Sequence, residues 1–307
     1  MAEGPWWPWN GRARQAYRRV SIRHRPTEPD PVEKPVRLTL TSRLAAAAAA
    51  LLLSACSSMM PVPDVPQRAG TDNPPRSILY VGNSFMYYNN SLHTMVLQIA
   101  RTLPDPKRAA HRATSLTISG SGIDWHDVAA YMKPDAIGRY SFIGDNEIRF
   151  NPPGRQFDAA MLMDCSQCPV HPQLRPVFFE FAKKHSDTLR RNGVEPMFLM
   201  TWAYQDKPEM TQGLADAYTE AGRLNRAHVI PAGLAFARSI AKRPDLNLYV
   251  ADKRHPSPAG SYLTAATIVA SVYGVSPVGA TFTAGLDPAV ARHLQETAQE
   301  TVQAYRR

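Results

Sequence analysis

From residue 76 onward, the chain alternates short apolar runs with longer stretches in which apolar residues recur every three or four positions. Short apolar runs bounded by polar residues are typical of strands buried on both faces of a parallel sheet. Apolar residues spaced three to four apart indicate amphipathic helices. Strands are predicted at 78–81, 115–118, 159–163, 197–201 and 229–230, and helices at 92–103, 177–191, 210–226, 233–242, 258–273 and 288–305.

This alternation predicts an α/β fold, a three-layer α/β/α sandwich around a mostly parallel, five-stranded, flavodoxin-like sheet. The chain of 307 residues is long enough for one such domain and an N-terminal extension. Residues 133–158, which contain several Gly and Pro, are predicted to be a long insertion between the second and third strands. Such an insertion either shapes a substrate cleft or only decorates the fold.

The segment before this domain has the pattern of an export signal. Arg37 and Arg43 precede an apolar run at 44–53, which is followed by small residues and Cys56. This run is too short to cross a hydrocarbon core, which takes roughly 20 residues, so it is typical of a signal peptide at 36–55. Leu53-Ser54-Ala55-Cys56 resembles a bacterial lipobox, which implies that Cys56 is the lipid-modified first residue of the mature protein. An ordinary secretory signal is the alternative.

The regions on either side of the signal complete the predicted organisation. Residues 1–35 do not suit a signal peptide, and we expect a disordered or mis-assigned extension with translation starting near Val36. Residues 56–75, rich in Pro, Ser and Asp, are predicted to be a flexible tether, and residues 76–307 the folded domain. The expected location is the bacterial cell envelope, with the membrane as a partner through the anchor at Cys56. Ser57 favours the outer membrane by the enterobacterial sorting rule.

Charge argues against a nucleic-acid-binding protein. The formal net charge is +9, but residues 1–43 hold nine Lys and Arg against four Asp and Glu, which leaves +4 for the rest of the chain. A surface that binds phosphate backbones should lie on the folded domain. With 44% hydrophobic and 20% charged residues, the composition is that of an ordinary globular protein with a sizeable core.

Two short segments carry the candidate chemistry. Gly82-Asn83-Ser84 follows the first predicted strand, and Asp252-Lys253-Arg254-His255 follows the last one. Functional groups of parallel sheets gather at the carboxyl ends of the strands, where Ser84 is expected. A carboxylate three residues before a histidine can bond one imidazole nitrogen and leave the other free to take a serine proton. The alternatives are an exposed loop histidine and a helix-capping aspartate.

These segments resemble the SGNH (GDSL-like) hydrolases, a superfamily of serine esterases and lipases. Gly82-Asn83-Ser84 matches the branch whose first block reads Gly-Asn-Ser, and the last block is matched by Asp252, His255, Pro256, Ser257 and Gly260. The resemblance spans roughly residues 76 to 275. It implies that Ser84 is the nucleophile, His255 the general base and Asp252 the residue that orients His255.

The resemblance also implies three oxyanion donors. They are the N–H of Ser84, a glycine after the second strand and an asparagine after the third. Gly120 is the preferred glycine and Gly122 the next, and the alternative for both is that they only turn the chain. No asparagine follows the third strand, where Gln167 is the candidate donor. Losing one donor costs a serine hydrolase about 2.7–4 kcal/mol of transition-state stabilisation.

The remaining polar and aromatic residues support fewer conclusions. Asn83, Trp125 and Trp202 are predicted to line the substrate site, with simple packing as the alternative for each aromatic residue. Cys165 and Cys168 form a single C-x-x-C pair, and one such pair is a weak signal for a zinc site. A local disulfide or two thiols are favoured over a redox role for this pair. The histidines show no metal-ligand spacing, so we expect neither a metal nor a cofactor.

The predicted activity is hydrolysis of an ester through an acyl-enzyme, with a carbohydrate or short-chain acyl ester as substrate. A carbohydrate deacetylase and a short-chain esterase both fit this description. One alternative is an O-acyltransferase, which uses the same three residues but excludes water. Another is a catalytically silent glycan-binding lipoprotein.

Overall fold

The computed structural model describes residues 74–104 and 112–306. The predicted N-terminal extension, the signal peptide, Cys56 and nearly all of the tether lie outside these residues. Five strands form one sheet in the order β2-β1-β5-β6-β7, and every neighbouring pair is parallel. They are β1 (Ser77–Gly82), β2 (Arg112–Thr117), β5 (Ala159–Leu162), β6 (Glu195–Leu199) and β7 (His228–Ile230). The predicted α/β fold with a parallel five-stranded sheet is therefore confirmed.

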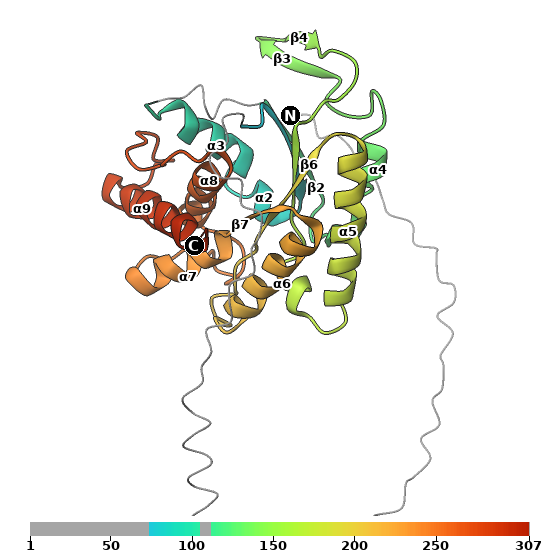
Figure 1. The fold of residues 1–307 in the computed structure, drawn as a ribbon. Helices are drawn as coiled ribbons and strands as arrows, with labels where there is room; N and C mark the ends of the chain where they lie inside the picture. Colours follow the sequence, from blue (N-terminus) through green and yellow to red (C-terminus); the bar gives the residue numbers. More distant parts are fainter. Residues whose placement is uncertain (1–73, 105–111, 307) are drawn as a thin grey trace, which may run out of the picture. The chain divides into compact units, whose positions relative to one another are not determined.

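Helices cover both faces of this sheet (Figure 1). One layer holds α3 (Leu92–Arg101), α7 (Ala232–Lys242), α8 (Pro258–Tyr273) and α9 (Pro288–Tyr305), and the other holds α4 (Val128–Tyr131), α5 (Arg175–Arg191) and α6 (Met210–Asn225). Because side chains alternate along a strand, β1 contributes to both cores. Ile78 and Tyr80 pack on the α8 side, whereas Leu79 and Val81 pack on the α5 side.

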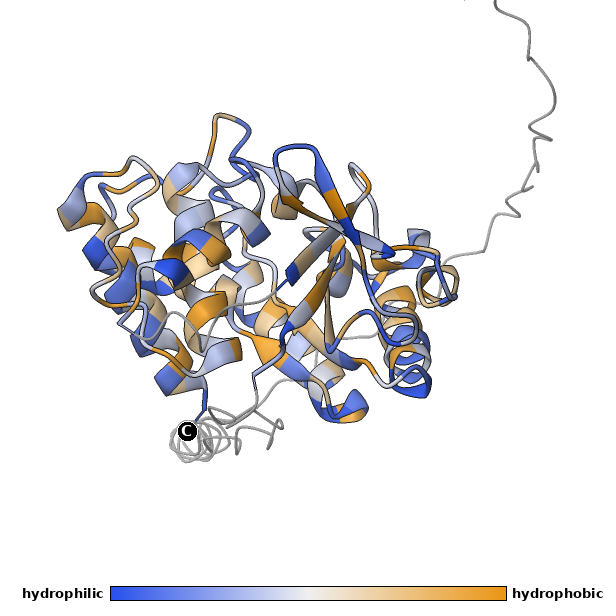
Figure 2. Ribbon diagram, turned by 90° about the horizontal axis from the view of Figure 1, so that it is seen from above, coloured by the Kyte–Doolittle hydropathy of each residue, from blue (hydrophilic) through white to orange (hydrophobic). Residues whose placement is uncertain are grey.

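Helix α8 lies at the centre of its layer, and every residue from 259 to 273 is buried. Its bounds follow from local chemistry: the Ser257 hydroxyl accepts the Gly260 N–H, Pro258 occupies the first turn, and Gly274 ends the helix with a φ of 63°. Figure 2 shows apolar residues along the strands and polar ones on the outer turns of the surrounding helices. None of the helices in the described part of the chain combines the length and apolar character needed to span a bilayer.

The structure differs from the prediction in two places. Strand β2 begins at Arg112, three residues before the predicted start, because it is a half-exposed edge strand whose first residues carry little apolar signal. The insertion at 133–158 contains a hairpin that we did not predict, formed by β3 (Tyr140–Gly144) and β4 (Glu147–Phe150). The available sequence signal was the alternation of apolar and polar residues on both sides of Asn146. In the structure Asn146 lies in the turn with a φ of 60°.

The hairpin segment is anchored at the amino ends of the strands. The Arg112 guanidinium, at the start of β2, donates to the carbonyl of Gln156 at 2.5 Å. The Asp158 carboxylate accepts the N–H of Ser77, at the start of β1, at 3.0 Å. Figure 1 shows β3 and β4 at the opposite end of the sheet from α2 (Ser84–Tyr87), which follows the carboxyl end of β1. The interpretation that this insertion shapes the substrate cleft is therefore wrong.

Gly260 allows α8 to pack closely against the preceding loop, and this contact can be tested. A Cβ at position 260 would lie 2.3 Å from the Leu248 carbonyl oxygen and 3.0 Å from the Phe236 ring. We expect Gly260→Ala to lower the free energy of unfolding by about 1–3 kcal/mol, which differential scanning calorimetry would detect. Gly144→Ala is the control, because its nearest neighbour is a flexible Glu147 side chain at 3.6 Å. Equal thermal unfolding midpoints for Gly260→Ala and Gly144→Ala would show that this close contact does not stabilise the fold.

Candidate active site

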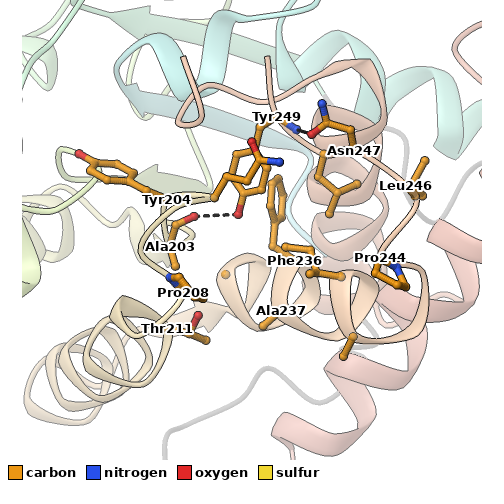
Figure 3. Close-up of a pocket in the computed structure, with 15 residues that line it drawn as sticks. Ala203, Tyr204, Pro208, Thr211, Phe236, Ala237, Pro244, Leu246, Asn247 and Tyr249 are labelled. Atoms are coloured by element: carbon orange, nitrogen blue, oxygen red, sulfur yellow. Dashed lines mark hydrogen bonds between the residues drawn. The ribbon is translucent and has the colours of Figure 1, made fainter. Parts of the chain in front are cut away.

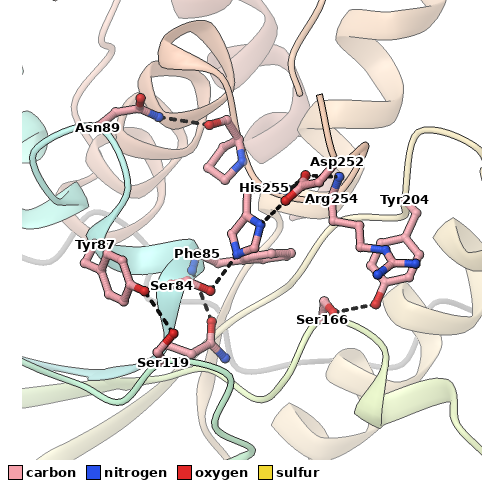
Figure 4. A network of polar contacts seen from close by, with 12 residues as sticks. Ser84, Phe85, Tyr87, Asn89, Ser119, Ser166, Tyr204, Asp252, Arg254 and His255 are labelled. Atoms are coloured by element: carbon pink, nitrogen blue, oxygen red, sulfur yellow. Dashed lines mark hydrogen bonds and ion pairs between the residues drawn. The ribbon is translucent and has the colours of Figure 1, made fainter. Parts of the chain in front are cut away.

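The structure brings Ser84, His255 and Asp252 together (Figure 4). The Ser84 Oγ lies 2.7 Å from Nε2 of His255, although the two residues are 171 positions apart in the sequence. The Nδ1 of His255 lies 2.5 Å from Oδ2 of Asp252. Ser84 is the first residue of α2, and His255 lies in the loop before α8. The three side chains thus form one continuous chain of hydrogen bonds at the carboxyl edge of the sheet.

Asp252 is held as a carboxylate by its hydrogen bonds. Its Oδ1 accepts the backbone N–H groups of Arg254 and His255, both at 2.9 Å. Burial acts to raise the pKa of Asp252, but the hydrogen bonds from the His255 ring and from these two N–H groups outweigh it and lower the pKa to about 2. A carboxylate beside Nδ1 keeps the imidazole proton on that nitrogen, so Nε2 is free to accept the Ser84 hydroxyl.

The His255 ring is also held by aromatic neighbours and by a link between two loops. It stacks on Tyr88, with ring centroids 4.3 Å apart, and meets Phe85 edge-on at 5.4 Å. The Asn89 amide donates to the Pro256 carbonyl at 2.9 Å and to the Ser261 hydroxyl at 2.8 Å. Asn89 therefore joins the segment that carries Ser84 to the segment that carries His255.

The sequence analysis missed Asn89. Its backbone φ is 53°, in the left-handed region that asparagine tolerates better than most residues, and Asn90 and Ser91 also have positive φ values. The sequence Asn-Asn-Ser before a helix was a signal for a turn. Its partners, 167 and 172 positions away, left no local signal.

Asn83 connects three strand-end loops rather than lining a substrate site. Its amide nitrogen donates to the carbonyls of Ser121 at 2.9 Å and Asp164 at 3.1 Å. Its side-chain oxygen accepts the Phe85 N–H and caps α2. The residue is only 4% exposed, and both amide hydrogens have partners. The prediction that Asn83 lines the substrate site is therefore wrong, because its polar atoms are used to position the loops.

Asp164 braces the same loops from the end of β5. Its Oδ1 accepts the N–H groups of Ile123 and Cys165, both at 2.7 Å, and the residue is 2% exposed. Burial raises the pKa of Asp164 to about 6, helped by the nearby charge of Asp124 and opposed by the two N–H donors. Asp164 thus ties the loop after β2 to the loop after β5.

The predicted oxyanion donors remain predictions. The Ser84 N–H occupies the first position of a helix, where no carbonyl one turn earlier is available to it. Gly120 has a φ of 72° in a turn closed by the Ser121 N–H and the Ile118 carbonyl, which supports its interpretation as a turn residue without excluding donation. Gly122 is buried in the same loop.

The third donor has no clear counterpart. Gln167 precedes the short helix η2 (Cys168–Val170), and its carbonyl accepts the Val170 and His171 N–H groups. In the described residues no hydrogen bond joins the Gln167 side chain to Ser84 or His255. The Ser166 hydroxyl instead lies 2.7 Å from the Tyr204 hydroxyl, close to the same loop (Figure 4).

The two predicted tryptophans have different environments. Trp202 is 0% exposed, stacks between Phe85 at 4.5 Å and Phe236 at 4.4 Å, and donates its indole N–H to the Arg254 carbonyl. The prediction that Trp202 lines the substrate site is therefore wrong. Trp125, on η1 (Ile123–Trp125), is 61% exposed, so it remains available to a ligand.

An apolar cavity of about 450 Å³ lies beyond this aromatic stack (Figure 3). Its lining includes Tyr204, Phe236, Leu248 and Tyr249. Neither the Ser84 nor the His255 side chain lines it. Because Phe236 stacks on Trp202 and Trp202 on Phe85, the three rings form a wall between the cavity and Ser84.

Cys165 and Cys168 form a disulfide with an S–S distance of 2.00 Å. The sequence left a disulfide and two thiols open, and the structure has the disulfide. Ligand atoms of Asp164, Cys165 and Cys168 lie within 4.8 Å of one another. With both sulfur atoms in the disulfide, the thiolates that a zinc site needs are not available.

The burial of Asp164 predicts a pH-dependent stability. Its pKa is about 6 in the folded protein against an ordinary value of 3.8, so the folded state holds this proton more tightly than the unfolded chain. The stabilisation is fully present below pH 3.8 and is lost as the pH rises through 6, by about 3 kcal/mol. Asp164→Asn keeps an acceptor oxygen and should remove this part of the pH dependence. Urea unfolding at pH 5 and pH 8 captures about 1.4 kcal/mol of this loss, and an equal change in the unaltered protein and the variant would refute the assignment.

Neither a family model nor a curated protein matches the sequence. Among solved structures, a DUF4886 family protein from Bacteroides uniformis matches with a TM-score of 0.52 and 16% identity, over 75% of this chain and 96% of that chain. An acetylxylan esterase from Geobacillus stearothermophilus has a TM-score of 0.46 and 11% identity, over 64% and 94%. The esterase EstA from Pseudoalteromonas sp. has a TM-score of 0.45 and 12% identity, over 65% and 97%. The chain shares the fold of the Bacteroides protein.

Proposed function

We propose that this protein is a serine ester hydrolase of the SGNH type. The observation that carries the proposal is the hydrogen-bonded chain from Ser84 through His255 to Asp252, with distances of 2.7 and 2.5 Å. A serine hydroxyl, a neutral imidazole and an ionised carboxylate in this order are the groups required for acyl transfer through serine.

In the proposed mechanism each group has a role. The Ser84 Oγ attacks the ester carbonyl while His255 Nε2 takes its proton, and Asp252 stabilises the resulting imidazolium. The Ser84 N–H, with Gly120 or Gly122, donates to the oxyanion. His255 then returns the proton to the departing alcohol, which leaves an acyl group on Ser84. Water, deprotonated by His255, cleaves this acyl-enzyme, and the proton returns to Ser84.

Solvent access favours hydrolysis over transfer to another alcohol. The side chains of Asp252 and His255 are 43% and 25% exposed. An acyltransferase must keep water from the acyl-enzyme, whereas this pair of residues is open to it. Hydrolysis is therefore the better assignment than O-acyl transfer.

The surroundings of Ser84 favour a short acyl group. The wall formed by Phe85, Trp202 and Phe236 separates the nucleophile from the apolar cavity, so a long acyl chain has no direct path into it. On the alcohol side, the exposed ring of Trp125 offers a surface on which a sugar ring can pack. We therefore propose acetyl or other short acyl esters of carbohydrates as the substrate class.

The proposed location is the bacterial cell envelope. The Leu53-Ser54-Ala55-Cys56 sequence supports export and lipid attachment at Cys56. The Cys165–Cys168 disulfide is consistent with an oxidising compartment outside the cytoplasm. An exported enzyme would meet envelope or environmental polysaccharides.

Removal of the nucleophile tests the proposal directly. Ser84→Ala should lower kcat for p-nitrophenyl acetate by roughly 10⁴-fold or more, because no other group can form the acyl-enzyme. Ser119→Ala, in the loop after β2, is the matched control. The Ser119 hydroxyl accepts a hydrogen bond from the Tyr87 hydroxyl at 3.1 Å but does not contact His255. A rate unaffected by Ser84→Ala would reject the nucleophile. No turnover by the unaltered protein, combined with binding of an oligosaccharide, would favour the glycan-binding alternative.

The Asn89 link predicts a second kinetic effect. Asn89→Gly preserves the positive φ but removes the amide that ties α2 to the Pro256 segment. We expect kcat to fall about tenfold, since small misplacements of reacting groups are costly. Asn90→Gly, at a φ of 68° on the exposed side of the same turn, should have little effect. Steady-state kinetics of both variants would compare them, and equal rates would show that the link does not position His255.

A further inference from the structure

One face of the β3–β4 hairpin is apolar and exposed. In its register Tyr140 lies opposite Phe150 and Phe142 opposite Ile148, and directly opposed residues of an antiparallel pair share a face. These four side chains are 51%, 63%, 74% and 44% exposed in the order named. The Tyr140 ring contacts the Phe142 and Phe150 rings at centroid distances of 6.0 and 6.2 Å. We call these four residues the hairpin face.

Within the described residues, neither hydrophobic core includes any member of the hairpin face. The other side of the hairpin is polar where its register is regular, because Ser141 lies opposite Arg149. A two-stranded hairpin alone is at best marginally stable in water. Four large exposed apolar groups on one side of such a hairpin therefore indicate a surface that is covered in use.

The position of the hairpin indicates which kind of partner covers the hairpin face. The segment is anchored at the amino ends of the strands, where the chain enters the domain at Ser77. Seventeen residues separate Cys56 from Pro74, the first described residue. A lipid attached to Cys56 would therefore be joined through this segment to the edge of the sheet that carries the hairpin. Helix α2, whose first residue is Ser84, lies at the opposite edge (Figure 1).

We propose that the hairpin face rests on the surface of a lipid bilayer. The inference uses the proposed Cys56 anchor to choose a membrane over another partner. Aromatic side chains are favoured at membrane–water interfaces, and an interfacial contact beside a lipid chain provides a second membrane-binding signal. This arrangement turns Ser84 away from the bilayer. The proposed esterase then acts on polymers on the aqueous side, not on lipids of the membrane that holds it.

Charge has little part in this contact. Residues 133–158 carry four basic and four acidic side chains, which balance. Arg139 lies over the Phe150 ring at 5.7 Å and near the Asp135 carboxylate at 3.8 Å. Binding should therefore occur on zwitterionic phosphatidylcholine vesicles and change little with salt, in contrast to attraction by anionic lipid.

A probe on each side of the hairpin tests the proposal in the full chain. An environment-sensitive fluorescent amino acid replaces Phe142, on the hairpin face, or Arg149, which is exposed on the other side. An interfacial element lies about 5–10 Å into the headgroup region, so brominated phosphatidylcholine should quench the probe at 142 by roughly half. The probe at 149 should be quenched much less. A third protein with the probe in place of Phe150 repeats the measurement on the hairpin face, and unchanged melting temperatures verify folding.

The outcomes separate this proposal from the others. Equal quenching at 142 and 149, or none at 142 and 150, overturns it. A probe signal at 142 that changes with protein concentration without vesicles indicates a second copy on the hairpin face and also overturns it. The mass of the N-terminal peptide reports acylation of Cys56, and p-nitrophenyl acetate turnover reports the enzyme. Quenching at 142 without acylation or turnover would support the hairpin contact while rejecting the anchor or the esterase.

Discussion

The hydrogen bonds at the carboxyl ends of three neighbouring strands are the constraint on which the candidate site depends. Asn83 donates to the carbonyls of Ser121 and Asp164, and Asp164 accepts the Ile123 N–H. A buried polar group left without a partner costs about 1–3 kcal/mol. The three loops therefore cannot move independently, and the turn that presents Ser84 is held relative to both neighbouring strands. The segment that carries His255 is tied to this assembly from the other side.

Environment assigns opposite roles to two aspartates of the same site. Asp252 is partly exposed and accepts hydrogen bonds from the His255 ring and two backbone N–H groups, so its pKa falls to about 2. Asp164 also accepts two N–H groups but is buried, and its pKa rises to about 6. The first provides a permanent negative charge beside the imidazole. The second holds loops together, and its ionisation is a cost to stability rather than a part of the chemistry.

Much of the fold was predictable from sequence because its signals are local. Strands buried on both faces appear as apolar runs. Helix α8 begins after Ser257 and ends before Gly274, and α9 begins after Asp287, each of which caps the helix. The edge strand β2 and the hairpin escaped prediction in part or whole, because exposed strands lack a continuous apolar run. Ser84, His255 and Asp252 were likewise visible in short motifs, since each segment carries its residues at a fixed spacing.

By itself the sequence determined the α/β class, the strand that precedes Ser84 and the Asp252–His255 pair, because these follow from patterns within a few residues. Only the tertiary structure decided what depends on residues far apart in the chain. It placed Asn83 in a buried network, enclosed Trp202 between two rings and linked Asn89 to a loop 167 positions away. Burial and hydrogen-bond partners are properties of the packed chain, so a residue's type alone cannot reveal whether it meets substrate or holds the site in place.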